Sequence, residues 1–411
     1  MNNQKKKGSQ DSKFLAQEHL DKIGEVAFYY GFCPMKSPTI TKADLDAAKD
    51  ILEGDHVDDE TDKHGKLPLH AEEKIAIMRM YHEQEMHDLP QPVMLYFKDP
   101  CRGAIKKGGY HRYADLEILG ASGPIAEATL IQAARAMLGE EGYTETMVEI
   151  NSTGDRESSA RFVRELTAYY RKNINEMTPE ARQLFKNDPF ELLSSRDEAV
   201  KELNSKAPRS MDFLSEISRR HLEETLEYLE ALGVPYVINN GLLGNRKYCT
   251  ETIFSIVNTG AGAKEQRVLG LGVRYNGLAK RLTMKRDIQG VGISLLIKEG
   301  KNDLRKLVTK IKRPIASFVQ LGLESKLISL NVIEQLRQVK IPLYLSMAKD
   351  RLGAQVSNVE KFHTPFMIVM GKKEAVEKTA IVRRMDTHAQ DIVPLADLPK
   401  YMKKAEDGLK R

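Results

Sequence analysis

The stretch MLYFKDPCRGAIKKGGYHRYADLEILG, residues 94–120, predicts two strands joined by a long basic loop. The loop follows Pro100 and carries cations beside paired glycines: Arg102, Lys106, Lys107, Gly108 and Gly109. Glycine lets a main chain approach a ligand closely and lysine supplies positive charge, so such a loop is suited to clamp phosphates or an RNA backbone. The alternative is a solvated hairpin tip that binds nothing.

The length and composition predict several domains. A chain of 411 residues is too long for one hydrophobic core, so we expect at least two domains. With 41% hydrophobic and 29% charged residues, and no run of eighteen apolar residues, the composition is typical of a soluble protein with no membrane span. The 63 basic and 58 acidic residues leave a net charge of +5, which permits an RNA partner without requiring one and gives no reason to expect DNA.

The N-terminal residues and the cysteines indicate in which cellular compartment the protein is expected. Residues 1–13 are basic and no apolar segment follows them, so we expect a disordered leader and not a signal peptide. Cys33, Cys101 and Cys249 are far apart and lack the spacing of metal ligands. This pattern predicts neither a disulfide framework nor a metal site, and a reducing cytoplasm is the expected location.

The pattern of apolar residues predicts an α+β core. Apolar residues recur at helical spacing over residues 14–30, 43–52 and 71–86, prolines force extended backbone over 32–41, and turn residues around 63–65 predict a hairpin. The elements expected further along are a helix over 124–142, a strand over 146–155, helices through much of 156–232 and two strand-like runs over 234–257. The glycine-punctuated segments 267–278 and 290–297 are expected to be strands, or a strand running into a helix. Strands and helices without regular alternation favour an antiparallel sheet over a doubly wound one.

The last hundred residues follow another pattern. Residues 298–313 are basic and predict the final helix of the core, with a domain boundary near Pro314. Strands and helices then alternate, which predicts a small, largely parallel sheet. The expected elements are strands over 316–322, 341–347, 365–371 and 379–385, and helices over 330–339 and 399–404, with a short helix after 347.

Taken together, several segments resemble a known family. LHAEEKIA, the basic hairpin, DLEILG, VEINSTGD, KYCTETIFSI, GVRYNGL and GVGISLL follow one another as in the catalytic core of class II histidyl-tRNA synthetases. Residues 365–395, PFMIVMGKKEAVEKTAIVRRMDTHAQDIVPL, are similar to the anticodon-binding domain of that family. The resemblance implies a class II antiparallel-sheet core over residues 14–313 and an α/β anticodon-binding-like domain over residues 314–411.

The resemblance also implies a chemistry, the adenylation of histidine with ATP and Mg²⁺ and its transfer to tRNA. It places Glu72 at the substrate ammonium group and Glu117 facing the histidine ring. On the same grounds we expect substrate contacts from Glu72, Glu117, Tyr248, Arg274 and Tyr275, ATP contacts from Arg102, Lys106, Lys107, Gly290 and Gly292, tRNA contacts from Lys372, Lys373, Arg383 and Arg384, and Arg102 as the catalytic cation. Each of these residues can equally be scaffold, since a glutamate on a helix is commonly solvated and a tyrosine in a strand commonly packs in the core.

The chain departs from the family at charged positions. An arginine of the histidine-binding stretch is replaced by Gly244, and a nearby acid by Lys247. In the last motif, Lys298 and Glu299 reverse the charges of a Glu-Arg pair. Loss of one fixed cation at a transition state costs about 3 to 4 kcal/mol, so these replacements predict little adenylation.

Three functions are compatible with this pattern. We favour a histidyl-tRNA synthetase-like protein of translation, weakly active or inactive, that binds tRNA, dimerises through residues 32–41, and uses ATP and Mg²⁺ only if active. The second is an active histidine–tRNA ligase with a remodelled site, in which Arg246, Lys106 and Lys107 take over. The third is a regulatory subunit like that of ATP phosphoribosyltransferase, although such subunits generally lack an anticodon-type domain. Weak binding of histidine alone is compatible with the first.

Overall fold

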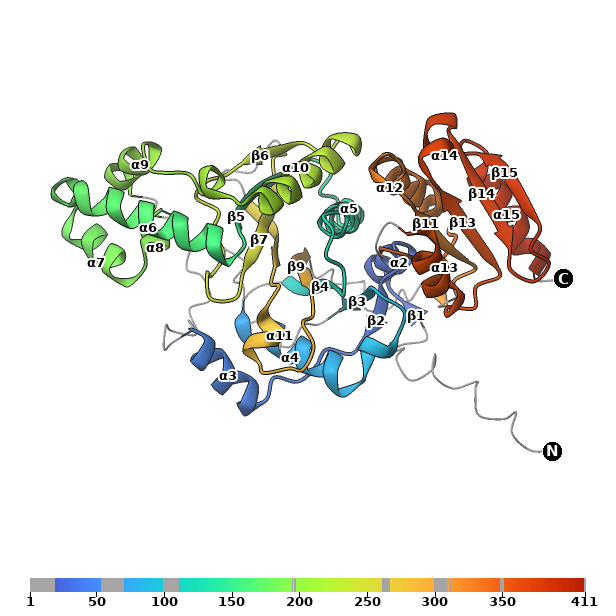
Figure 1. Ribbon diagram of the computed structural model, residues 1–411, viewed down its shortest axis with the longest axis horizontal. Coiled ribbons are helices and arrows are strands. Elements are labelled where there is room, and N and C mark those ends of the chain that lie inside the picture. Colours follow the sequence, from blue (N-terminus) through green and yellow to red (C-terminus); the bar gives the residue numbers. More distant parts are fainter. Residues whose placement is uncertain are drawn as a thin grey trace.

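Two large sheets, and a two-stranded pair of β1 with β10, are formed by the described part of the chain (Figure 1). The computed structural model describes residues 19–52, 70–98, 111–193, 195, 197–260, 267–298, 309–310, 312–347 and 351–409. Within these residues, an eight-stranded sheet has the order β2-β3-β4-β9-β8-β7-β5-β6, and a five-stranded sheet of C-terminal residues has the order β12-β11-β13-β14-β15. The expected α+β architecture with a separate C-terminal α/β unit is confirmed.

The large sheet is mainly antiparallel. Its strands are β2 (Cys33–Met35), β3 (Val93–Phe97), β4 (His111–Leu119), β5 (Thr146–Gly154), β6 (Tyr236–Ile238), β7 (Thr250–Asn258), β8 (Arg267–Arg274) and β9 (Gly290–Lys298). Only the β2–β3 and β5–β6 pairs are parallel among them. β3 and β4 pair antiparallel with Leu95 opposite Glu117, which confirms the two strands predicted from residues 94–120. The basic loop between them lies outside the described residues.

Alternation along β4 divides the core into two layers. Leu116 and Ile118 pack in the hydrophobic cluster that contains α5 (Ile125–Glu140) and α10 (Glu216–Ala231). Leu119 packs in a second cluster with α4 (Ala71–Glu83). Because successive side chains of a strand point to opposite faces, Glu117 faces the α4 layer. The sequence predicted helices at α4 and α5, and both are confirmed.

Smaller helices complete the core. α3 (Lys42–Leu52) confirms the helix predicted over residues 43–52 and packs against α4, and α11 (Leu278–Arg281) follows β8. A helical branch extends away from the sheet at the left of Figure 1 and consists of α6 (Arg156–Lys172), α7 (Pro179–Asn187), α8 (Pro189–Leu193) and α9 (Glu198–Ser205). Asp155 caps α6 by accepting a hydrogen bond from the Ser158 backbone N at 2.8 Å. Short 3₁₀ turns lie at Met86–Asp88, Ile174–Glu176 and Ser210–Phe213.

The C-terminal sheet is mixed. Its elements are β11 (Ala316–Gln320), α12 (Leu323–Gln338), β12 (Leu343–Leu345), α13 (Leu352–Glu360), β13 (Phe366–Met370), α14 (Lys372–Glu377), β14 (Thr379–Arg384), β15 (Gln390–Pro394) and α15 (Leu398–Leu409). β11 pairs parallel with β12 and β13, whereas β14 pairs antiparallel with β13 and β15. The expectation of a largely parallel sheet is therefore wrong for its second half. Strand β15 was not predicted, because four of its five residues are exposed and it carries no apolar alternation.

Two predicted helices are partly wrong. Within residues 14–30, the described part begins with β1 (His19–Leu20), and α2 (Lys22–Tyr29) starts only after Asp21, whose carboxylate accepts from the Gly24 backbone N at 2.8 Å. β1 pairs antiparallel with β10 (Thr309–Lys310), which lies in the segment predicted as a helix over 298–313. At residues 19–20 and 309–310 the two segments, almost 300 residues apart, pair as strands although their apolar residues have helical spacing. Most of residues 298–313 and the predicted turn around residues 63–65 lie outside the described residues. The domain limits therefore stay a prediction.

The C-terminal unit is docked on the core. α12 contacts α2 and α10, and Figure 1 shows these helices side by side. Lys340 Nζ donates to Glu25 Oε1 at 2.8 Å, and Gln132 Nε2 donates to the Leu330 carbonyl at 3.0 Å. None of the described helices is long and apolar enough to cross a membrane.

Candidate functional site

A buried ion pair lies between α4 and the large sheet. Lys74, on α4, is 2% exposed, and its ammonium group pairs with the carboxylate of Glu117, which is fully buried on β4. The hydroxyl of Tyr275 donates to the other oxygen of Glu117 at 2.5 Å. The Lys74 ammonium also lies 5.6 Å from the centre of the Tyr275 ring, within range of a cation–π contact. Both oxygens of Glu117 are thus engaged by side chains of the chain itself.

Two glycines of β9 make room for this arrangement. Gly292 lies opposite Glu117 in the sheet, and a Cβ atom on Gly292 would come 2.0 Å from Glu117 Oε2. A Cβ atom on Gly290 would come 2.4 Å from the Tyr275 ring. These are the glycines that the resemblance assigns to ATP, and in the structure each lies against a buried side chain.

The surroundings of Lys74 are acidic. Glu72 and Glu73 on α4 and Asp115 on β4 are also buried, with 2%, 6% and 3% of their surfaces exposed. Burial raises the pKa of Asp115 to about 6, with Lys74 acting against the rise and Glu117 adding to it. Burial lowers the pKa of Lys74, but the attraction of Glu117 and then of Asp115 outweighs it, and the pKa is raised. Lys74 therefore stays protonated at neutral pH.

Tyr248 and Cys249 close one side of the same layer. Burial raises the pKa of the Tyr248 hydroxyl well above 10, and interactions with Cys249, Glu72 and Glu73 add to the rise. Burial likewise raises the pKa of the Cys249 thiol to about 12. Both side chains are neutral at physiological pH, so this part of the layer offers hydrogen-bonding groups without charge.

Gly244 has no space for a side chain. A Cβ atom built on it would come 2.8 Å from both Cβ and Sγ of Cys249. Arg246, two residues on, points to the helical branch, where its Nε lies 3.2 Å from Asp188 Oδ2. The backbone N of Lys247 donates to Asn245 Oδ1 at 2.9 Å, which holds the turn between them.

Arg274 belongs to the other face of the sheet. Its guanidinium group donates to Glu127 on α5, with Nε 2.6 Å from Oε1 and Nη2 2.5 Å from Oε2, and both side chains are fully buried. Burial raises the pKa of Glu127, but Arg274 and then His221 outweigh it and hold the pKa well below its usual range. His221 Nε2 lies 2.8 Å from Glu127 Oε1, and Thr252 Oγ1 donates to the same oxygen at 2.7 Å.

The structure thus separates the predicted substrate residues into two groups. Glu72, Glu117, Tyr248, Tyr275, Gly290 and Gly292 lie in or against the layer that contains α4 and Lys74, whereas Arg274 lies on the opposite face of the sheet with Glu127. Arg102, Lys106, Lys107 and Glu299 lie outside the described residues. Sequence reasoning missed Lys74. The available signal was its place within the apolar stripe Ala71, Ile75 and Met78, where a charged residue is unusual.

The predicted tRNA-binding residues lie on two elements that contact each other. Lys372 and Lys373 are on α14, with 77% and 73% of their side chains exposed, and Arg383 and Arg384 are on β14. Neighbouring groups partly neutralise them. Lys372 Nζ lies 3.0 Å from Glu324 Oε1, and Arg384 Nη2 lies 3.3 Å from Asp386 Oδ2.

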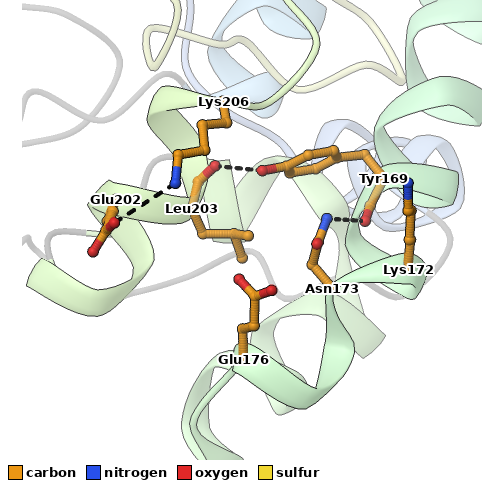
Figure 2. Close-up of a pocket in the computed structure, with 7 residues that line it drawn as sticks. All are labelled: Tyr169, Lys172, Asn173, Glu176, Glu202, Leu203 and Lys206. Carbon is orange, nitrogen blue, oxygen red and sulfur yellow. Dashed lines mark hydrogen bonds and ion pairs between the residues drawn. The ribbon is translucent and has the colours of Figure 1, made fainter.

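A cavity of about 440 Å³ lies in the helical branch (Figure 2). Its lining comes from the end of α6, the turn that follows, and α9, and consists of Tyr169, Lys172, Asn173, Glu176, Glu202, Leu203 and Lys206. The Tyr169 hydroxyl donates to the Leu203 carbonyl at 2.8 Å and so joins the two helices. None of these residues belongs to the layer around Lys74. No group of three or more His, Cys, Asp or Glu side chains with the geometry of a metal site occurs within the described ranges.

The chain is similar in sequence to known proteins over most of its length. Residues 324–405 match the anticodon binding domain family. The chain is 25% identical over 402 residues to the histidine–tRNA ligase of Symbiobacterium thermophilum, covering 93% of this chain and 92% of that one. It is 26% identical over 393 residues to the histidine–tRNA ligase of Desulforamulus reducens, covering 92% and 93%. A crystal structure of apo S. aureus histidyl-tRNA synthetase aligns with a TM-score of 0.49 and 22% identity over 92% of this chain and 93% of that one.

Proposed function

Because this chain belongs to the class II histidyl-tRNA synthetase-like family, we propose that it binds tRNA in translation and activates histidine weakly or not at all. The observation that carries the proposal is the contact between Gly244 and Cys249. By resemblance, the position of Gly244 belongs to an arginine that acts on the reacting groups. A Cβ atom there would already come 2.8 Å from the Cys249 thiol, so no cation can extend from this backbone. The loss of one such cation corresponds to about two to three decades in rate.

The neighbouring groups offer little compensation. Arg246 is paired with Asp188 of the helical branch, 3.2 Å away, and would have to leave that carboxylate to reach a substrate. Glu117, the residue assigned to the histidine ring, already holds Lys74 and Tyr275. Any activation that remains would require ATP and Mg²⁺, which supply the phosphoanhydride and neutralise its charge. Arg102, Lys106 and Lys107 are the residues we propose for holding the phosphates.

The tRNA-binding part of the proposal rests on the C-terminal unit. Lys372, Lys373, Arg383 and Arg384 lie on the neighbouring elements α14 and β14 of the segment that matches the anticodon binding domain. Four cations on adjacent elements can neutralise several phosphates, and the affinity should then fall steeply with salt. A role in translation makes the cytoplasm the proposed location.

Two assays on the full chain test the proposal. Histidine-dependent exchange of pyrophosphate into ATP should be absent or several orders of magnitude below that of an ordinary synthetase. Filter binding of tRNA between 50 and 200 mM salt should show saturable, salt-sensitive binding, as is usual for phosphate contacts. The variant K372A/K373A should bind tRNA more weakly and with a smaller salt slope, whereas the control K42A/K49A, which removes two exposed lysines of α3, should bind normally. Equal binding by both variants would exclude α14 from the RNA surface.

An active histidine–tRNA ligase is the second candidate, favoured by similarity to ligases over more than nine-tenths of the chain. In that case exchange by the unaltered protein would be robust. It would fall strongly in R246A or R102A if those arginines had replaced the missing one. Exchange that is robust and sensitive to either change would refute the proposal of weak activation.

The proposal includes a homodimer. β2 lies at one edge of the eight-stranded sheet and belongs to residues 32–41, which the resemblance places at a dimer interface. An edge strand offers unpaired backbone groups to a second copy, and a two-fold axis would place both copies of β2 together. Light scattering should give twice the mass of one chain. A monomer at tens of micromolar protein would remove this part of the proposal.

A further inference from the structure

The position of the Lys74 ammonium group is specific. Moving a charged amine out of water is costly, and a protein retains one only where its partners compensate. Lys74 is 2% exposed, and its compensation comes from the fully buried Glu117 carboxylate and from the face of the Tyr275 ring at 5.6 Å. A carboxylate combined with an aromatic face is the usual environment of a bound organic cation.

The rest of this environment also favours a cation. Tyr275 donates its hydroxyl to Glu117 at 2.5 Å and so orients the carboxylate. Asp115, on the same face of β4, is 3% exposed, and its Oδ1 atom accepts no hydrogen bond from any described residue. Gly292 leaves space for the carboxylate of Glu117, since any side chain at that position would overlap with it. The walls are therefore arranged around a positive charge, and Lys74 provides it.

We propose that Glu117, Tyr275 and Asp115 form a cation-recognition site that the chain fills with its own Lys74, so that Lys74 excludes small organic cations such as imidazolium and alkylammonium ions. One buried carboxylate cannot hold two cations a few ångströms apart, because their mutual repulsion would cancel the attraction. Lys74 is thus the residue that determines which ligands the layer accepts. The inference rests on the proposed function in one respect, since Glu117 is the residue that the family resemblance assigns to the histidine ring.

Chemical rescue tests this inference. Lys74→Ala removes Cγ, Cδ, Cε and the ammonium group, and n-propylammonium has the same atoms. We expect K74A to unfold at a lower temperature than the unaltered protein, and n-propylammonium chloride at 1 to 50 mM to raise its melting temperature in a saturable manner. The uncharged analogue n-propanol should not do so. The ion should leave the melting temperatures of the unaltered protein and of the exposed control K201A unchanged.

Further variants keep the test decisive. K74A/E117Q lacks the carboxylate and should show no response to n-propylammonium. If K74A does not fold alone, its yield of refolding with n-propylammonium, compared with n-propanol, becomes the measurement. Imidazole titrated by calorimetry at pH 6 should bind K74A, with loss of binding in K74A/E117Q, and should not bind the unaltered protein.

The possible results separate the two proposals. Rescue of K74A that depends on Glu117 supports an internally occupied cation site. K74A that folds without any specific response to n-propylammonium, or unaltered protein that binds imidazole as tightly as K74A, would overturn it. These measurements use neither ATP nor tRNA. Robust pyrophosphate exchange by the unaltered protein would therefore refute the proposed function without altering the rescue result, and failure of rescue would leave the exchange result standing.

Discussion

Gly244 lies so close to Cys249 that a Cβ atom on residue 244 would come 2.8 Å from the cysteine Sγ atom. The Cys249 thiol is buried, and its backbone N donates to the Asn245 carbonyl at 2.9 Å, so the turn between the two residues has little freedom to open. The single change Gly244→Arg would therefore not restore the missing arginine, because the surrounding backbone and side chains leave no space for it.

The first prediction concerns this contact. Gly244→Ala should lower the free energy of unfolding by about 1 to 3 kcal/mol, the usual cost of overpacking a closed site. Cys249→Gly in the same chain should recover part of the loss, because it removes both atoms that the new Cβ meets. Gly139→Ala is the matched control, since a Cβ atom there meets nothing within 4 Å and the residue lies in α5. It should stabilise the protein by up to about 1 kcal/mol. Urea unfolding measures all three, and equal effects of G244A and G139A would contradict the packing argument.

The second prediction concerns the buried pair of Arg274 and Glu127. Glu127→Gln leaves a guanidinium group fully buried without its carboxylate, and we expect a loss of about 3 kcal/mol or more in the free energy of unfolding. The exposed pair of Lys201 and Glu198 provides the control, because breaking a surface pair with Glu198→Gln should cost less than about 1 kcal/mol. Chemical denaturation of both variants measures the difference. A loss in E127Q as small as that in E198Q would show that the pair contributes no more than a surface one.

The third prediction concerns pH. The pKa of Asp115 is raised from 3.8 to about 6 in the folded protein, so the folded state holds this proton more tightly than the unfolded chain. The proton bound by Asp115 therefore stabilises the folded state fully below about pH 4, and this stabilisation is lost as the pH rises to about 6. A pKa shift of about two units corresponds to about 3 kcal/mol of folding free energy. Asp115→Asn should abolish this decline. The measurement is the difference in unfolding free energy between the unaltered protein and D115N from pH 4 to 7, with Asp50→Asn on the exposed side of α3 as the control. A difference that does not change over this range would contradict the prediction.

The fourth prediction concerns thiol reactivity. Burial raises the pKa of Cys249 to about 12, so only a very small fraction is thiolate at pH 8, and the thiolate is the reactive form. Cys33 is only half-buried and should be alkylated before Cys249. Iodoacetamide labelling followed by peptide mass spectrometry should find Cys249 unmodified in the folded protein and fully modified in urea. Equal labelling of Cys33 and Cys249 before unfolding would mean that the layer around Lys74 opens readily.

Much of the fold could be predicted because its signals are local. The paired strands of residues 94–120 could be recognised from apolar runs on either side of a basic loop, and α4 and α5 from apolar residues at helical spacing. The same patterns failed for β1, β10 and β15. These strands are short or exposed and exist because a partner strand lies beside them, and no local pattern contains that information.

The sequence by itself determined which residues could carry charge and where most strands of the two larger sheets would form, and its family resemblance pointed to Glu117 and Tyr275 as neighbours of a ligand. Only the tertiary structure decided what Glu117 binds. Lys74 precedes Glu117 by 43 residues and lies on a helix, and the two meet because α4 packs across the face of β4 to which Glu117 points. An ion pair of this kind depends on a distance of a few ångströms in a medium of low dielectric constant, and that distance is set by packing between elements that the order of residues along the chain does not specify.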